Sequence, residues 1–328
     1  MLRACRYDPA TRLFNQFPIE ELTERLKDPT AVLWVDFCEE PPEFASPILL
    51  ETFHFHPLAV DDALVETHIP KLDDWGDYLY LVFNPLEMGT NGSMELITRE
   101  LDVFITPNCL VTFHDDALPF LERTWKTHLQ IPRVNPTAPG HLLYRMVDEM
   151  VNDTFTLLED LDDRLDEIEE EVLLKSKPDT LEGIFTMKRV VIGIRRVLVP
   201  EREVVNKLSR EDFAALGSVE KLFFRDIYDH MLRMVDLNEG LRDLVTGAME
   251  THLSVTNNRM NQVMKILTII TTLFMPISFI TGFFGMNFFA APGTLDHWTS
   301  STFFHVALAI LIISPLSMLW YMRQHRWM

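Results

Sequence analysis

Hydrophobic positions follow three different periodicities along this chain. In residues 1–140, short apolar runs alternate with turn residues, which is typical of strands. The clearest predicted strands are 31–37 (AVLWVDF), 78–83 (YLYLVF), 101–105 and 110–113. Pro107-Asn108 indicates a hairpin between the last two runs, and 61–67 reads as a helix. Residues 1–140 are therefore expected to form an α/β domain.

From residue 141 to about 260 the pattern changes to long helices. Apolar positions step by four and three residues, as on a heptad seam, at Val147, Val151, Thr154, Leu158, Leu161, Leu165, Ile168 and Val172. Pro178 interrupts this helix and another begins near Thr180. A last pattern starts near residue 219 and meets no proline before Pro276. One helix from 219 to 284 would be roughly 100 Å long at 1.5 Å per residue.

Two uncharged apolar runs lie near the end of the chain. They predict a transmembrane domain over residues 261–328. Residues 266–284 and 303–321 contain no Asp, Glu, Lys or Arg. About 20 such residues cross a hydrocarbon core of about 30 Å, so spans are expected at about 265–285 and 302–322. Two buried helices of a soluble core are the alternative interpretation. Because a hairpin cannot enclose a water-filled path, conduction would require several copies around one axis.

Charge is distributed as unevenly as hydrophobicity. Residues after 250 hold four of the 29 basic side chains and one of the 49 acidic ones, so the first 250 residues carry a net charge of −23. An acidic body excludes a nucleic-acid partner, whose phosphates require a basic surface. Basic residues flank both predicted spans but are absent from the loop between them. The positive-inside rule then places both termini in the cytoplasm of a multi-pass protein of the cell membrane.

Sequence motifs for enzyme chemistry are absent. The chain contains no GxGxxG, Walker loop, GxSxG or HExxH. Its three cysteines form no CxxC pair, which argues against a thiolate metal site. We therefore expect neither an enzyme nor a bound cofactor. A membrane-anchored coiled-coil scaffold and an anchored enzyme remain as alternatives from other functional classes.

The first predicted span ends in Gly285-Met286-Asn287, within the stretch NNRMNQVMKILTIITTLFMPISFITGFFGMNF. Here the chain resembles the CorA family of magnesium and cobalt transporters, whose signature is a GMN tripeptide closing the first of two C-terminal helices. Further sequence similarity to this family occurs in FFRDIYDH (223–230) and HFHPLAVDDAL (54–64). The resemblance implies a funnel-shaped homopentamer in a lipid bilayer, with an α/β domain, a long stalk helix lining the pore and an outer second span.

The resemblance also implies a path for divalent cations. Asn287 would accept hydrogen bonds from the first-shell waters of Mg²⁺, an ion that dehydrates reluctantly. Gly285 would let the backbone turn, and Met286 would pack beside it. An acidic ring at Glu250 would lie further along the stalk. The pore face would consist of Asn261, Met264, Leu267, Thr271, Met275 and Ser278, with Met264 and Leu267 as a hydrophobic gate.

A Mg²⁺ sensor follows from the same resemblance. Asp61 and Asp62 match paired acids of the family's α/β domain, and Asp226 matches an acid on the stalk of the neighbouring subunit. Mg²⁺ bridging them would clamp subunits together and close the pore. One departure bears on the transported ion: residues 288–296 (FFAAPGTLD) lack the acids that often follow GMN, apart from Asp296. A Zn²⁺ transporter of the same fold, possibly proton-coupled, is the alternative.

Overall fold

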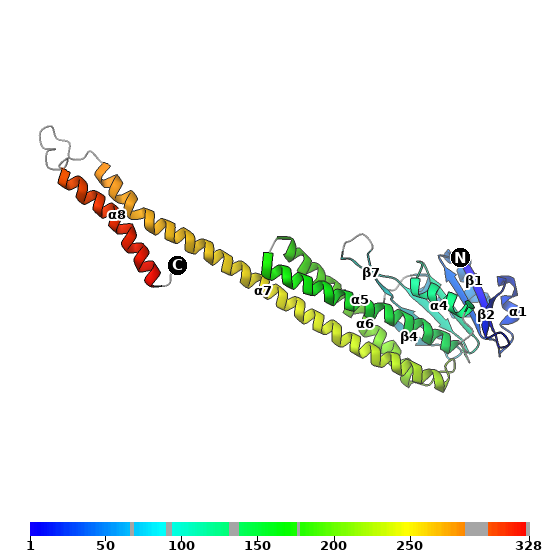
Figure 1. Cartoon of the computed structure of the whole chain (residues 1–328). Coiled ribbons are helices and arrows are strands. Elements are labelled where there is room, and N and C mark those ends of the chain that lie inside the picture. The colour runs from blue at the N-terminus through cyan, green and yellow to red at the C-terminus, as the bar shows by residue number, and fades with distance from the viewer. Residues whose placement is uncertain (66–68, 90–93, 131–137, 176–177, 286–300, 326–328) are drawn as a thin grey trace. The chain divides into compact units, whose positions relative to one another are not determined.

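The structure is a computed structural model that describes residues 1–65, 69–89, 94–130, 138–175, 178–285 and 301–325 (Figure 1). Contacts divide the chain into two compact units, residues 1–249 and residues 250–328. The α/β region and the cytoplasmic helices predicted from the sequence thus share one compact unit. The apolar C-terminal runs lie in the other.

A seven-stranded sheet forms the centre of the N-terminal unit. Its strand order is β2-β1-β3-β9-β8-β5-β4, and every neighbouring pair is antiparallel except β3 and β9. A two-stranded sheet of β6 and β7 lies beside it. The strands are β1 (Leu2–Asp8), β2 (Leu13–Gln16), β3 (Leu33–Cys38), β4 (Lys71–Asp74), β5 (Leu79–Phe83), β6 (Leu86–Met88), β7 (Leu96–Thr98), β8 (Leu101–Ile105) and β9 (Cys109–His114).

Both faces of the large sheet are buried. Successive side chains of a strand point to opposite faces, so neighbouring residues of one strand join different core clusters. In β5, Leu79 and Leu81 belong to one core cluster while Tyr80 and Val82 belong to the other. This explains the continuous apolar runs in the sequence. One face packs against short helices: η1 (Ile19–Glu21), α1 (Leu22–Arg25), α2 (Pro42–Pro47), the π-helical η2 (Ile48–Thr52) and α3 (Pro57–Leu64).

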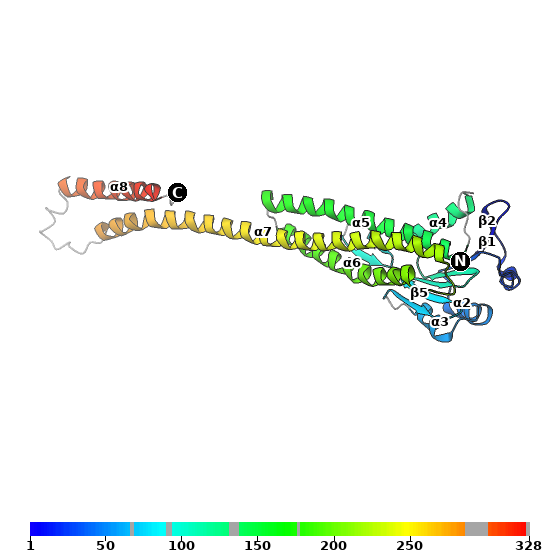
Figure 2. The same cartoon turned by 90° about the horizontal axis from the view of Figure 1, so that it is seen from below.

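Long helices cover the other face (Figure 2). They are α4 (Pro119–Gln130), α5 (Pro139–Lys175), α6 (Pro178–Arg210) and the first part of α7 (Ser218–Gly285). The predicted heptad seam is confirmed, because all of its residues are buried in α5 except the half-buried Ile168. The stalk prediction is also confirmed: α7 is one helix of 68 residues.

The sequence analysis was incomplete in several places. The helix expected over 61–67 begins at Pro57, where His56 caps its amino end, and it stops at Leu64 because Val65 is extended. Residue 67 lies outside the described residues. Strand β1 and helix α4 were not predicted at all. The predicted hairpin at Pro107-Asn108 is confirmed, with the N–H of Thr106 donating to the carbonyl of Cys109 at 2.9 Å.

The C-terminal unit contains the remainder of α7 and helix α8 (Ser301–Gln324). Both helices are long and apolar enough to span a membrane, and the apolar windows that qualify them are not buried within the chain. The half-buried positions of α8 form one stripe: Ala307, Leu311, Ser314, Pro315, Met318 and Leu319. Both views place α8 beside the last turns of α7 (Figures 1 and 2).

Candidate functional site: a membrane helix and two groups of acids

Helix α7 presents the predicted pore face to the outside of the C-terminal unit. All six residues of that face are exposed: Asn261, Met264, Leu267, Thr271, Met275 and Ser278. The half-buried positions of the same segment are others: Ile269, Thr272, Leu273, Pro276, Ile277 and Ile280. In a single copy, the proposed pore face is therefore left open while a different stripe is partly covered.

Two threonine hydroxyls on this helix are satisfied by carbonyls of the preceding turn. Thr271 Oγ1 donates to the carbonyl of Leu267 at 2.9 Å, and Thr268 Oγ1 donates to the carbonyl of Met264 at 2.7 Å. Such bonds to the preceding turn let threonine occupy an apolar helix without an unsatisfied hydroxyl. The exposed face consequently offers mainly apolar surface around Met264 and Leu267.

Gly285 is the last residue of α7, so the helix ends where the tripeptide begins. A Cβ at Gly285 would meet no atom of the described residues within 4 Å, so no close packing against that part of the chain requires glycine there. Met286 and Asn287 lie outside the described residues, and the filter assignment stays a prediction. Glu250, the first residue of the C-terminal unit, is exposed on α7.

The first group of acids lies on α3. Asp61 is exposed, whereas Asp62 is half-buried and paired with the ammonium of Lys71 at the start of β4. The same ammonium lies 3.3 Å from Asp73 Oδ2. The two predicted sensor acids therefore differ: Asp61 faces solvent, and Asp62 already has a cationic partner.

The second group of acids lies where α5 and α7 meet. Asp226 is exposed on α7 and interacts electrostatically with Asp148 of α5. Burial and the charge of Asp226 raise the pKa of Asp148, although Arg145 and His230 act in the opposite direction. The sequence analysis missed Asp148, because its neighbours on the heptad helix are also acidic and nothing in the pattern distinguishes it.

Carboxylate oxygens in this arrangement suit Mg²⁺, which prefers oxygen ligands and often uses only one or two carboxylates. Burial is the largest cause of the raised pKa of Asp148, and Arg145 Nη1 already lies 3.3 Å from its Oδ2, so a divalent ion there would offset only the smaller repulsion from Asp226. Within the described part of one chain, however, no group of three or more His, Cys, Asp or Glu is arranged to hold a metal ion. The acids of α3 and those of α5 and α7 remain two separate groups.

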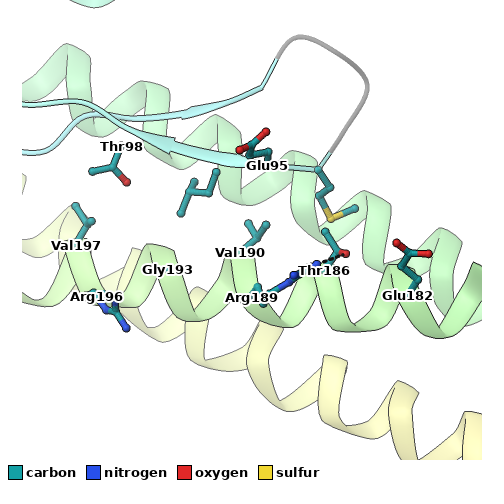
Figure 3. A pocket seen from close by; sticks show the side chains of 11 residues that line it. Glu95, Thr98, Glu182, Thr186, Arg189, Val190, Gly193, Arg196 and Val197 are labelled. Atoms are coloured by element: carbon teal, nitrogen blue, oxygen red, sulfur yellow. Dashed lines mark hydrogen bonds between the residues drawn. The ribbon is translucent and has the colours of Figure 1, made fainter. Parts of the chain in front are cut away.

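A cavity of about 920 Å³ lies elsewhere in the N-terminal unit, between β7 and α6 (Figure 3). Two carboxylates, Glu95 and Glu182, and two guanidinium groups, Arg189 and Arg196, line it, so their charges cancel. Gly193 brings α6 close to the hairpin here, because a Cβ would lie 2.8 Å from Leu96 Cδ2. A charge-balanced cavity of this kind gives a cation no electrostatic reason to bind.

Comparison with known proteins identifies the family of this architecture. The family model described as "CorA-like Mg2+ transporter protein" matches residues 30–324. The putative metal ion transporter YfjQ of Bacillus subtilis is 32% identical over 315 residues, covering 95% of this chain and 94% of that protein. The cobalt/magnesium transport protein CorA of Thermotoga maritima is 32% identical over 280 residues, covering 85% and 78%.

More distant relatives extend the comparison. A zinc transport protein, ZntB of Yersinia pseudotuberculosis, is 23% identical over 91% of this chain and 89% of its own length. Among solved structures, the CorA magnesium transporter of Methanocaldococcus jannaschii has the same fold, with a TM-score of 0.83 at 23% identity over 100% of this chain and 99% of that one. The predicted order of α/β domain, long helices and two C-terminal apolar helices is thereby confirmed, and this chain belongs to the CorA-like Mg²⁺ transporter family.

Proposed function

We propose that this chain is a subunit of an oligomeric membrane channel for divalent cations, with Mg²⁺ and Co²⁺ as the transported ions. One observation carries the proposal: α7 leaves six residues, from Asn261 to Ser278, exposed along one face and ends at the Gly285 of a GMN tripeptide. Several copies around an axis would turn that face into the wall of a pore. The relatives named as cobalt/magnesium transport proteins support the choice of ions.

The subunit number and orientation belong to the same proposal. A pentamer is the arrangement implied by the family resemblance, and the basic flanks of both spans favour cytoplasmic termini. Asn287 carboxamides at the mouth would accept hydrogen bonds from the hydrated ion, which avoids most of the cost of stripping its water. Met264 and Leu267 would close the path by dewetting.

Regulation by internal Mg²⁺ follows from the energetics of the ion. A divalent cation gains about 4.6 kcal/mol at 100 mV, which corresponds to roughly a 2,000-fold accumulation. A channel that did not close at high internal Mg²⁺ would overload the cell with the ion. We infer that Mg²⁺ held between Asp61 or Asp62 of one copy and Asp226 with Asp148 of the next stabilises the closed state, since carboxylates near one another repel until a cation joins them.

Zinc transport is the second candidate. It is favoured by the relatives named as zinc transport proteins and by the absence of acids in residues 288–295. Those relatives are 23–25% identical, against 32% and 26% for the two cobalt/magnesium relatives, so Mg²⁺ and Co²⁺ are better supported.

Substituting Asn287 tests the channel. Asn287→Ala removes the carboxamide that receives the ion, so Mg²⁺ uptake into liposomes should fall at least about tenfold, equivalent to about 1.4 kcal/mol. Gel filtration should show an unchanged oligomer. Asn257→Ala, in α7 before the predicted span, is a matched amide control. Uptake by Asn287→Ala at the wild-type rate would refute the filter.

Substituting Asp226 tests whether internal Mg²⁺ closes the channel. Asp226→Ala removes the stalk carboxylate, so flux should persist at internal Mg²⁺ concentrations that close the wild type. A ligand shifts a two-state equilibrium only through its different affinity for the two states. Asp236→Ala provides an acid-to-alanine control on the same helix. Superimposable inhibition curves for wild type and Asp226→Ala would show that these acids are ordinary surface charges.

A further inference from the structure

Lys71 places a permanent positive charge inside the first group of acids. It is the first residue of β4, the edge strand of the large sheet, and its ammonium binds Asp62 Oδ2 of α3. The same ammonium lies 3.3 Å from Asp73 Oδ2. Because Asp73 is two residues further along β4, its side chain emerges on the same face as that of Lys71. One ammonium is thus shared by two carboxylates.

An aromatic ring holds this ammonium from the side of the sheet. Lys71 Nζ lies 4.9 Å from the centroid of the Tyr80 ring, within cation–π distance. Tyr80 is fully buried, and its hydroxyl donates to Asp102 Oδ1 at 2.5 Å. Burial lowers the pKa of Lys71, but the bonds and charges of Asp62 and Asp73 outweigh it and raise that pKa. Lys71 therefore stays charged at neutral pH.

We propose that Lys71 is a tethered cation that competes with the divalent ion for Asp62 and so sets the ion concentration at which the sensor fills. This inference rests on the proposed sensor and names the residue that tunes it. Asp61 is exposed and would meet the incoming ion first, whereas an ion that takes Oδ2 of Asp62 has to displace the ammonium of Lys71 from that oxygen.

Asp73 makes that withdrawal possible at small cost. An ion bound to Asp62 repels the ammonium, and a lysine head on a flexible stem turns readily toward its second acceptor. That acceptor is already 3.3 Å away, so the ammonium keeps one carboxylate and the Tyr80 ring after leaving Asp62. Lys71 and Asp73 should consequently change the affinity of the sensor in opposite directions.

The test measures Mg²⁺ protection of the full-length oligomer in detergent against a glutamate-specific endopeptidase, because none of the variants below gains or loses a glutamate. Lys71→Met removes the charge but keeps an apolar stem on Tyr80, and the midpoint of protection should fall about threefold to tenfold. Asp73→Asn leaves Lys71 only Asp62, so the midpoint should rise about threefold. Asp73→Asn in the Lys71→Met background should shift the midpoint no more than the adjacent control Asp74→Asn.

Two further variants separate this role from general charge and from folding. Lys71→Arg keeps the cation and should stay within about twofold of wild type, and Lys126→Met on α4 removes an equal charge elsewhere. If Mg²⁺ protects the wild type but Lys71→Met and Asp73→Asn leave the midpoint unmoved or move it in the same direction, Lys71 does not tune the sensor, although the sensor stands. If Mg²⁺ does not protect even the wild type, the sensor and this inference fail together.

Discussion

The two units of this chain differ in how far they bury phenylalanine side chains. Phe104 in strand β8 has no exposed surface and stacks on Phe55 at 4.3 Å and on Tyr80 at 4.8 Å. Phe279 in α7 is 73% exposed, and the ring that it contacts, Phe283, is itself 46% exposed. Both segments are rich in apolar residues. Among the described residues, the first segment is covered by surfaces that exclude water and the second is not.

This difference shows where each unit obtains its stability. The N-terminal unit has two core clusters, one on each face of a sheet. The C-terminal unit exposes apolar side chains along two helices, which lipid and neighbouring copies would cover. A contiguous apolar surface of that kind marks a membrane or protein interaction. The comparison therefore predicts different responses to the same substitution in the two units.

The largest expected effect is on the N-terminal core. Phe104→Ala should lower the free energy of unfolding of this unit by about 3–5 kcal/mol, because it leaves a cavity among stacked rings. Phe279→Ala should leave that free energy unchanged. Hydrogen exchange of the β5 and β8 amides in the full-length protein measures both. Equal losses for the two variants would contradict the separation of the units.

A pH-dependent effect of comparable size is expected from a buried carboxyl between sheet and helices. Glu201 of α6 is buried and accepts the N–H of Asn84 at 2.8 Å, while Asn84 Oδ1 is buried without a partner among the described residues. Burial raises the pKa of Glu201 to about 8. Folding thus takes up a proton, so the stability contributed by this group is present below its unfolded pKa of about 4.5 and is lost as pH rises through about 8.

Glu201→Gln keeps the shape and the acceptor but cannot ionise. Between about pH 5 and 8 the unfolding free energy of the wild type should fall relative to Glu201→Gln by up to about 1.4 kcal/mol per pH unit. Glu203→Gln, a neighbour paired with Arg202 at the surface, is the matched control. Parallel stability curves for wild type and Glu201→Gln, measured by urea denaturation at several pH values, would show that Glu201 is ionised in the folded protein.

The same contrast explains what could be predicted from the sequence. Strands β3, β5, β8 and β9 were predicted because sheets covered on both faces require continuous apolar runs. Strand β1 was not, because Arg3 and Arg6 interrupt its pattern. Arg3 is nevertheless accommodated: its Nε donates to Asp36 Oδ2 at 2.8 Å, and its guanidinium lies 4.3 Å from the Trp125 ring centroid. Partners this distant in sequence leave no local signal.

Buried charge was the least predictable feature. Asp36 is fully buried in β3 and lies 3.2 Å from His114 Nε2 in the parallel neighbour β9. Burial would raise the pKa of Asp36, but His114, Arg3 and Thr112 hold it below its usual value. The apolar C-terminal helices, in contrast, were predictable from the sequence. Their length, their lack of charge and the GMN tripeptide were all visible in the sequence, because lipid imposes a local requirement on each span.

The C-terminal unit carries the central claim, and ion flux tests it most directly. The wild-type protein is reconstituted into liposomes that contain a Mg²⁺ dye or a Zn²⁺ dye, with the interior held near −100 mV. We predict Mg²⁺ influx that depends on the potential, that exceeds Zn²⁺ influx and that is absent from liposomes without protein. Zn²⁺ influx without Mg²⁺ influx would assign the chain to zinc transport, and flux of neither ion would contradict the proposed channel.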